Sequence, residues 1–445
     1  MDTQWAQLSP EEKMEQRFNG WLNPQGVTFI SMEAEKAYKI RVQRLINVYK
    51  VQEPDRVPVS LPVGAMPAYL YGMDYKTAMY DYDKTIQAWK KFNEEFELDY
   101  IVSPSAILPG KVYDLLDYKL YTWPGHGLPG NATGFQYVEG EYMKADEYGA
   151  LIRDPSDFLT RVFMPRAFGA FEPFRMLRSL FSVIELPTFY FMPYAIPQVQ
   201  TAQQTLIDVG REISQWTRTI SEFSKQRMEL GFPQMTFSAF CKAPFDTIGD
   251  TLRGTKGAMT DMYRQPDKLL KAMDVIADMT IDSAISSVNS FKGLMAYFPL
   301  HKGADGWMSN KQFEAFYWPS LKKVINALIN EGILVSLFAE GSFNTRLESV
   351  NEFPKGSVHW MFDRTDMAMA KKILGNRCSI SGNVPASLLV AGTPQKVKEY
   401  CRNLIEVCGK GGGYILVPGT VNITEAKPEN LRAMIDAAKE YGMYR

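Results

Sequence analysis

The second half of the chain carries five short apolar runs, which read GLMAYF (293–298), ILVSLF (333–338), SVHWMF (357–362), CSIS (378–381) and GYILVP (413–418). Between and after these runs, the sequence predicts helices over residues 309–332, 344–351, 366–374, 393–407 and 427–442. Ser309 and Thr393 are suited to cap two of these helices, and Pro319 is expected to kink the first or break it in two. Continuous apolar strands that alternate with helices are typical of a parallel sheet covered by helices.

The first half is less regular but adds three expected strands, at residues 57–63, 99–103 and 235–240. Helices are expected over residues 83–97, 247–263 and 266–290. Three strands and five strands make eight, so the predicted fold class is α/β, an eight-fold β/α (TIM) barrel. We expect an N-terminal helical extension over residues 1–50 and a barrel over residues 51–445. A long insertion is expected over residues 104–232 of the first half.

Composition excludes several classes of protein. The 445 residues include 49 Lys and Arg and 50 Asp and Glu, a net charge of -1, which argues against a nucleic-acid partner held by phosphate contacts. No run of about 20 apolar residues occurs, so no integral membrane segment is expected. The four cysteines form no C-x-x-C pair and no signal peptide is evident, which together favour a reduced, cytoplasmic setting.

Residues 168–197 are rich in Phe, Met and Tyr but are interrupted by charged residues and prolines. We interpret this stretch as a partly buried insertion or a subunit interface, which is compatible with a homo-oligomer. An interfacial membrane segment is the alternative.

The active site of a β/α barrel lies at the carboxyl ends of its strands, so the polar residues that follow each expected strand are the candidates for chemistry. They form a ring at one end of an apolar barrel, which favours an enzyme. The ring consists of Asp246, Asp250, Arg253, His301, Lys302, Asp305, Glu340, Asp363, Asp366, Asn383 and Thr420.

Several of these residues have plainer interpretations. Asp366 and Asp246 could each cap a helix, and Arg253 could pair with Asp250 at i,i+3. His359 lies inside a strand and is expected to be packed or exposed rather than catalytic. Glu340 stands apart, because a carboxylate between a buried strand and a small-residue turn costs free energy unless it is paired or used.

Known nucleophile and metal motifs are absent from the sequence. It contains no G-x-S-x-G, H-E-x-x-H, H-x-C or C-x-x-C, and Cys241 and Cys378 are interpreted as core residues. The GKGGG at residues 409–413 precedes its strand, so it is interpreted as a helix-to-strand turn rather than a phosphate loop. Metal binding by Glu340, Asp363 and Asp305 stays open, since spacing alone does not test it.

Three segments in order resemble the C-terminal part of the uroporphyrinogen decarboxylase superfamily. They are GNVPASLLVAGTPQKVKEYCRNLI (382–405), GGGYILVPG (411–419) and KPENLRAMIDAAKEYG (427–442), within a match that covers about residues 290–445. Weaker similarity runs through DRVPVSLPV (55–63), ELDYIV (97–102) and APFDTIGDTLRG (243–254). The resemblance implies an eight-fold β/α barrel. The superfamily also includes corrinoid-dependent methyltransferases.

The departures from this superfamily indicate which branch is nearer. Uroporphyrinogen decarboxylases carry an arginine-rich motif after the first strand, where this chain has LPVGAMPAYLYG. Their catalytic aspartate is replaced by Ser103 or Ser105, and Asp250 stands where they carry a tyrosine. The zinc methyltransferases carry H-x-C and a late cysteine, but here those positions hold Phe338-Ala339-Glu340 and Thr420. The resemblance is therefore closer to the methyltransferase branch, without the thiol-activating zinc site.

The function that this resemblance implies is transfer of a methyl group from a small methylated compound, such as a methoxylated aromatic, to the corrinoid (cobalamin) of a partner protein. We expect Glu340 as the catalytic acid, supported by His301 and Asp363. We expect substrate contacts from Phe338, Asp250, Arg253, Lys302, Asp305, Asn383 and Thr420. Two alternatives stay open: a lyase that decarboxylates a small acid held by Lys302 or Arg253, and a non-catalytic barrel subunit.

Overall fold

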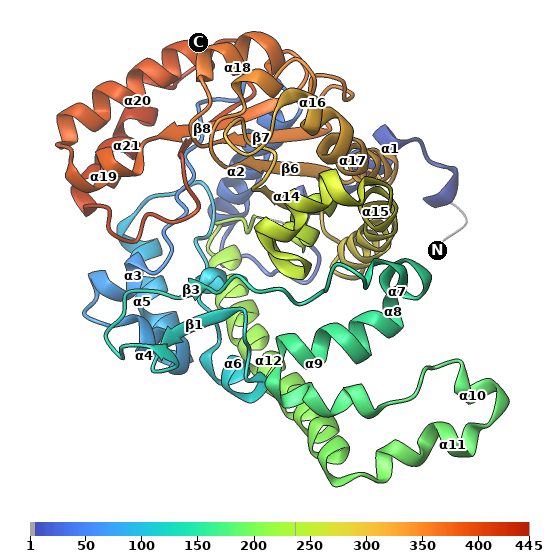
Figure 1. Cartoon of the computed structure of the whole chain (residues 1–445). Coiled ribbons are helices and arrows are strands. Elements are labelled where there is room, and N and C mark those ends of the chain that lie inside the picture. Colours follow the sequence, from blue (N-terminus) through green and yellow to red (C-terminus); the bar gives the residue numbers. More distant parts are fainter. Residues whose placement is uncertain (1–4, 236, 445) are drawn as a thin grey trace.

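The computed structural model describes residues 5–235 and 237–444. Its centre is a six-stranded, fully parallel sheet in the order β4-β5-β6-β7-β8-β9, with helices packed around it (Figure 1). The strands are β4 (Phe237–Phe240), β5 (Met295–Leu300), β6 (Leu334–Ala339), β7 (Val358–Phe362), β8 (Ser379–Val384) and β9 (Tyr414–Pro418). The α/β class and the parallel sheet are thereby confirmed.

The helices around the sheet match the prediction in part. They are α13 (Pro244–Asp246), α14 (Gly254–Arg264), α15 (Pro266–Ser290), α16 (Asn310–Gln312), α17 (Trp318–Asn330), α18 (Met367–Leu374), α19 (Ala386–Ala391), α20 (Pro394–Cys408) and α21 (Pro428–Tyr441). A π-helical turn at Thr247–Leu252 replaces the first part of the helix expected over residues 247–263, and α13 and α19 were not predicted. Ser309, Asp366 and Thr393 each cap a helix, as expected. Pro319 stands in the first turn of α17, directly after a π-helical turn at Phe313–Tyr317. The helix expected over residues 344–351 is wrong, since only a 3₁₀ turn at Asn344–Arg346 forms.

Of the three strands expected in the first half, β4 forms, but the two at residues 57–63 and 99–103 are not regular strands. Val59 makes a single parallel bridge to Leu416 of β9, and Ile101 makes one to Gln234, just before β4. Pro58 and Pro62 lack the N–H that a continuous ladder needs.

Side chains link these two segments instead of a backbone ladder. The Val59 N–H donates to the Asp99 carboxylate at 3.2 Å, and the Leu61 N–H donates to the Tyr100 hydroxyl at 2.9 Å. Six strands therefore form a continuous hydrogen-bonded ladder. The two further segments, residues 57–63 and 99–103, are joined to each other mainly through side chains.

The apolar side chains of the strands pack into two separate cores. In β6, Val335, Leu337 and Ala339 pack into the core that includes the surrounding helices. Leu334 instead packs with Met295, Ile415 and Val417 and with residues of α1 (Pro10–Leu22) and α2 (Met32–Tyr49), which cover the amino ends of the strands. Because side chains alternate along a strand, Ser336, Phe338 and then Glu340 lie on the inner face.

The remaining elements surround the site and form the insertion. The N-terminal part holds α3 (Met66–Leu70), α4 (Tyr75–Tyr80) and α5 (Tyr82–Glu95). The insertion holds α6 (Gly110–Leu116), β1 (Tyr121–Pro124), β2 (Gly127–Leu128), β3 (Gln136–Tyr137), α7 (Tyr148–Arg153), α8 (Pro155–Phe158), α9 (Met164–Ala167), α10 (Ser182–Glu185), α11 (Pro187–Phe191) and α12 (Pro197–Glu229). Helices α10 and α11 form the tip of an arm that projects from the body at the lower right of Figure 1. Within the described residues, no helix is both long enough and apolar enough to span a membrane.

Candidate active site

A buried carboxylate, Asp250, organises the cations at the carboxyl end of the sheet. It lies in the π-helical turn Thr247–Leu252, and its Oδ2 is 2.6 Å from Nδ1 of His301, which follows β5. Lys302 Nζ lies 2.8 Å from Oδ1, and Lys242 Nζ lies 3.2 Å from Oδ2. Burial opposes the charge of this carboxylate, but His301 and the two lysines hold the pKa of Asp250 well below its usual range.

Asp246 fixes the loop that carries His301. Its carboxylate accepts the backbone N–H groups of His301 and Lys302, at 3.0 and 2.9 Å, and the hydroxyl of Tyr317 at 2.6 Å. The interpretation of Asp246 as a helix cap is therefore wrong, because its side chain bonds no helix N–H. Complete burial, with the Asp250 charge nearby, raises the pKa of Asp246.

Glu340 stands at the carboxyl end of β6, where the inner face of the strand opens. Its Oε1 is 3.6 Å from Nε2 of His301, and 39% of its side chain is exposed. Burial raises the pKa of Glu340. His301 opposes that rise, whereas the carboxylates of Asp246 and Asp363 add to it. Burial lowers the pKa of His301, but Asp250, Asp246 and Glu340 outweigh it, so the pKa of this imidazole is raised.

Glu340 opens into a cavity of about 700 Å³ at the carboxyl ends of β6 to β9. Asp363 is held there by the N–H of Gly341, which donates to its Oδ2 at 3.0 Å. Asn383 is fixed by its own amide, which donates to the carbonyls of Asp363 and Thr365. The structure thus brings together five of the predicted site residues in one cavity, namely Phe338, Glu340, Asp363, Asn383 and Thr420.

Two predicted residues have other structural tasks. Arg253 is buried and pairs with Asp261 at 2.7 Å and with Glu141, so it joins α14 to the insertion rather than pairing with Asp250. Asp305 accepts the hydroxyls of Ser342 and Thr345 at 2.7 and 2.8 Å, which ties two loops together.

Three aromatic side chains pack together on the neighbouring strands β4 and β5. Phe237 and Phe240 of β4 lie 5.3 and 5.7 Å from the ring of Tyr297, and the two Phe side chains are 50% and 71% exposed. Burial and the charge of Glu340 both raise the pKa of Tyr297. The insertion also reaches this region, because the Tyr137 hydroxyl donates to the backbone carbonyl of Asp250.

Sequence reasoning missed Lys242, Tyr317 and Arg364. Lys242 comes two residues after β4, so the rule that found His301 could have found it. Tyr317 lies on a helix and its direction has no sequence signal. Arg364 lines the cavity with an 81% exposed side chain, 3.7 Å from Asp363, and it follows β7 in the same way as Asp363 itself.

Other plain interpretations hold. His359 is buried, with its two ring nitrogens 2.9 and 3.0 Å from the hydroxyls of Ser379 and Ser381, and burial lowers its pKa to about 3. Cys241 and Cys378 are buried. Residues 409–413 connect α20 to β9, as a turn should.

The three positions where related methyltransferases carry zinc ligands lie together, since Phe338, Glu340 and Thr420 all line the cavity. Only one of the three is an ionisable donor, which does not fit a thiol-activating zinc site. Among the described residues, no group of three or more His, Cys, Asp or Glu side chains is placed to hold a metal ion.

Comparison with known proteins places the chain. The family model described as uroporphyrinogen decarboxylase (URO-D) matches residues 209–441, just over half of the chain. The chain belongs to the uroporphyrinogen decarboxylase family. Its match includes all six laddered strands, from β4 to β9.

The relatives of this family member are distant. The uroporphyrinogen decarboxylase of Cellvibrio japonicus is 25% identical over 208 residues, which cover 46% of this chain and 56% of that protein. That of Psychromonas ingrahamii is 26% identical over 187 residues, 41% of this chain and 51% of that protein. The chain thus matches only about half the length of these relatives.

Among solved structures, a methyltransferase from Methanosarcina mazei matches with a TM-score of 0.58 at 15% identity, covering 90% of this chain and 98% of that one. The two proteins share a fold.

Proposed function

We propose that this protein transfers a methyl group from a small methylated compound to a corrinoid carried by a partner protein. The observation that carries the proposal is Glu340. It is an acid of raised pKa at an open cavity, and it faces an imidazole that is itself held by Asp250. We also propose that the segments at residues 57–63 and 99–103, although they form only single bridges, close an eight-fold barrel with the six laddered strands.

The chemistry requires one proton at a defined atom. The methyl–oxygen bond of the substrate breaks and its electron pair stays on the oxygen. A reduced corrinoid on the partner protein would supply the electron pair for the new bond to the methyl group. Glu340 delivers its proton to the leaving oxygen, because burial raises its pKa and so favours the protonated form of an acid that opens into the cavity. His301, with its raised pKa, returns a proton to Glu340 through Nε2.

The surroundings suit a flat, apolar substrate. Phe338 lines the cavity, Tyr297 feels the charge of Glu340, and the rings of Phe237 and Phe240 pack against Tyr297. Aromatic side chains stack on flat rings and exclude water, so we propose a methoxylated aromatic compound as the methyl donor. The cavity is open rather than filled by side chains, which favours an enzyme over a non-catalytic subunit.

The test is incubation of the protein with a reduced corrinoid protein and a panel of methoxylated aromatics and methylamines. We expect the absorbance of the methylated corrinoid to appear with at least one methoxylated aromatic. The corresponding phenol should be released in equal amount. No methylation with any donor would overturn the proposal.

Decarboxylation of a small carboxylic acid is the second candidate. The names of the curated relatives favour it, and so does Arg364, a cation at the rim of the cavity. Lys302 and Arg253, the cations expected for this role, are instead bound to Asp250 and to Asp261 and Glu141. Release of carbon dioxide from a carboxylate, without methylation of corrinoid, would select this reaction.

A further inference from the structure

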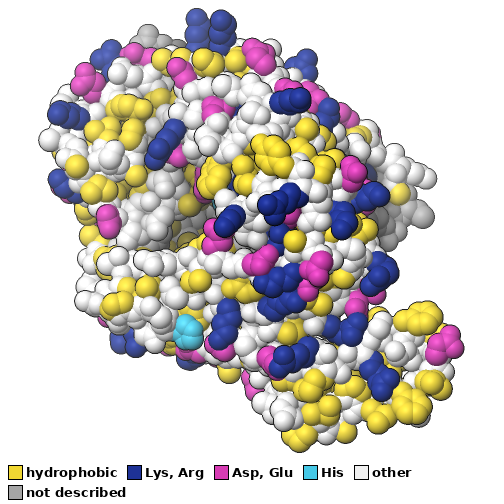
Figure 2. Space-filling model, viewed as in Figure 1, with side chains coloured by type: hydrophobic (Ala, Val, Ile, Leu, Met, Phe, Trp, Pro, Cys, Tyr) yellow, Lys and Arg dark blue, Asp and Glu magenta, His cyan; other side chains and the backbone are white. Residues whose placement is uncertain are grey.

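The strongest feature outside the site is the tip of the arm, which we define as residues 180–192. Seven large apolar side chains of the tip are between 46% and 72% exposed, namely Leu180, Phe181, Ile184, Leu186, Phe189, Phe191 and Met192. The arm has a small core around Phe171, Phe174 and Val199, and none of the seven belongs to it. Figure 2 shows these side chains as a yellow cluster at the lower right.

The amount of apolar surface indicates a protein interface. With about 200 Å² for each large side chain, the tip exposes on the order of 800 Å² of apolar surface. A typical monomer has a largest apolar patch of roughly 300–600 Å². A standard protein interface buries about 800 Å² on each partner. The tip therefore supplies the area that one partner in a stable complex needs.

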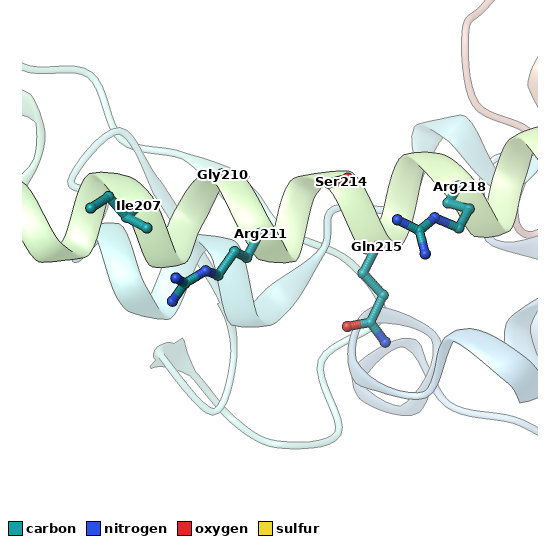
Figure 3. A pocket seen from close by; sticks show the side chains of 6 residues that line it. All are labelled: Ile207, Gly210, Arg211, Ser214, Gln215 and Arg218. Atoms are coloured by element: carbon teal, nitrogen blue, oxygen red, sulfur yellow. The ribbon is translucent and has the colours of Figure 1, made fainter.

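The helix behind the tip, α12, has a second uncovered surface. Its buried residues Ala202, Val209, Trp216 and Phe223 recur every seven positions and form one stripe. The other side of the helix carries a shallow depression, shown in Figure 3. It is lined by Ile207, Gly210, Arg211, Ser214, Gln215 and Arg218. Because Gly210 and Ser214 are small, another helix can approach α12 closely there.

The charges of the two surfaces are complementary. The tip carries Glu185 and the depression carries Arg218, and within the described part of the chain neither has an ion-pair partner. The other charges of the arm are engaged, since Arg175 pairs with Glu172, and Arg178 lies over the ring of Phe189. Free lysines and arginines, which an anionic membrane surface would select, are lacking at the tip.

We propose that the arm binds a second copy of this chain, with the tip of each copy on the α12 depression of the other. This exchange is self-complementary, as a two-fold interface must be, and it places Glu185 of each copy against Arg218 of the other. Each copy carries both surfaces on its arm. A two-fold axis between two antiparallel arms therefore lets both tip-to-depression contacts form at once. Figure 1 shows the arm away from α19 to α21.

Sedimentation of the full chain over a range of concentrations tests the proposal. We expect a dimer, and we expect Ile184→Lys to raise its dissociation constant at least about thirtyfold, as for a residue at the centre of an interface. Ile30→Lys, at an equally exposed apolar residue outside the arm, is the matched control and should leave the dimer intact. A monomeric wild type, or a dimer unaffected by Ile184→Lys, would refute the interface.

A charge exchange identifies the partner as a second copy. Glu185→Arg and Arg218→Glu should each weaken the dimer, and the double variant should restore it, because its opposite charges meet again. No recovery in the double variant would contradict this contact. Flotation with vesicles of phosphatidylcholine and phosphatidylglycerol tests the alternative, in which the tip binds a membrane. If monomeric protein floats, the tip is a membrane anchor and the proposal is wrong.

All four native cysteines are buried, so Ile184→Cys would introduce the accessible thiol of the arm. When this variant is mixed with Ser214→Cys, which places a thiol in the depression, a bis-maleimide reagent should join the tip of one chain to the depression of the other, and the unmodified chain should stay uncoupled. Failure to couple at concentrations where the wild type sediments as a dimer would count against the tip as the contact.

Discussion

Glu340 owes its proposed chemistry to the point where β6 ends. One residue earlier, Ala339 packs into the core, and two residues earlier, Phe338 lines the cavity. This position makes the carboxylate half-buried, and burial is the main reason that its pKa is raised. The same rule, a polar residue at the carboxyl end of a strand, predicted Asp363, Asn383 and Thr420 correctly as neighbours.

The rule fails for Arg253 and Asp305, because it contains no information about distant partners. Arg253 is bound by Glu141 of the insertion, and Asp305 is bound by Ser342 and Thr345 of the next loop. Contacts between loops depend on how separate segments pack in space, and no spacing along the sequence encodes that packing.

We expect Glu340→Gln to lower the turnover of methyl transfer by about 100-fold or more, because the amide has no proton to give. Substrate affinity should change little, since the side chain keeps its size. Steady-state kinetics with the corrinoid protein measures both values. Wild-type turnover in this variant would exclude Glu340 as the acid.

The dependence of the rate on pH should report the raised pKa of Glu340. The acid acts when protonated, so the rate should fall as pH rises through that pKa, at a pH above the usual value of about 4.3. Asp363→Asn removes an anion that raises this pKa, and the fall should move to lower pH. His301→Gln removes a cation that lowers it, and the fall should move to higher pH. Identical profiles in all three proteins would refute the assignment.

Asp250→Asn should destabilise the protein at neutral pH by roughly 3 kcal/mol, because it leaves the buried Lys302 unpaired. The native carboxylate has a depressed pKa, so its contribution is present above the unfolded value of about 3.9 and is lost as pH falls. Denaturant unfolding measures the change in stability. The pKa of His301 should also fall, which NMR can follow because the chain has only three histidines.

The secondary-structure elements differ in how well the sequence predicts them. Strands β5 to β9 were predicted within two residues at every end except the carboxyl end of β8, which runs three residues further, because each begins as a short apolar run between good turn or cap residues. The segments at 57–63 and 99–103 look similar in sequence but form only single bridges. Prolines break the first, and side chains of Asp99 and Tyr100 take over the bonds that a ladder would make.

The hairpin of β1 and β3 reaches the site through one hydroxyl, so Tyr137→Phe tests whether the insertion positions Asp250. We expect a several-fold lower turnover and a loss of about 1 kcal/mol of stability, the value of one hydrogen bond. The decisive readout is a changed pKa of His301 by NMR. An unchanged histidine titration would mean that the hairpin is structural only.

In the whole molecule, stability should be distributed unevenly. The large core includes strands β5 to β9, whereas the arm rests on the small cluster around Phe171 and Val199. Hydrogen exchange followed by mass spectrometry, at a concentration too low for association, should show α10 and α11 exchanging long before the sheet. Equal protection of both regions would show that the arm unfolds only with the body.

The side-chain seam between residues 57–63 and 99–102 lies outside the part of the chain that the family model matches, although both segments show weaker similarity to the same superfamily. All six laddered strands fall inside the span that matches the family, and the seam and most of the insertion fall outside it. Because no continuous ladder crosses the seam, substitutions, lengthened loops or grafted segments on its far side leave the shared strand pairing untouched. We therefore expect that changes beside the seam can alter the surroundings of the cavity without disturbing the six-stranded sheet.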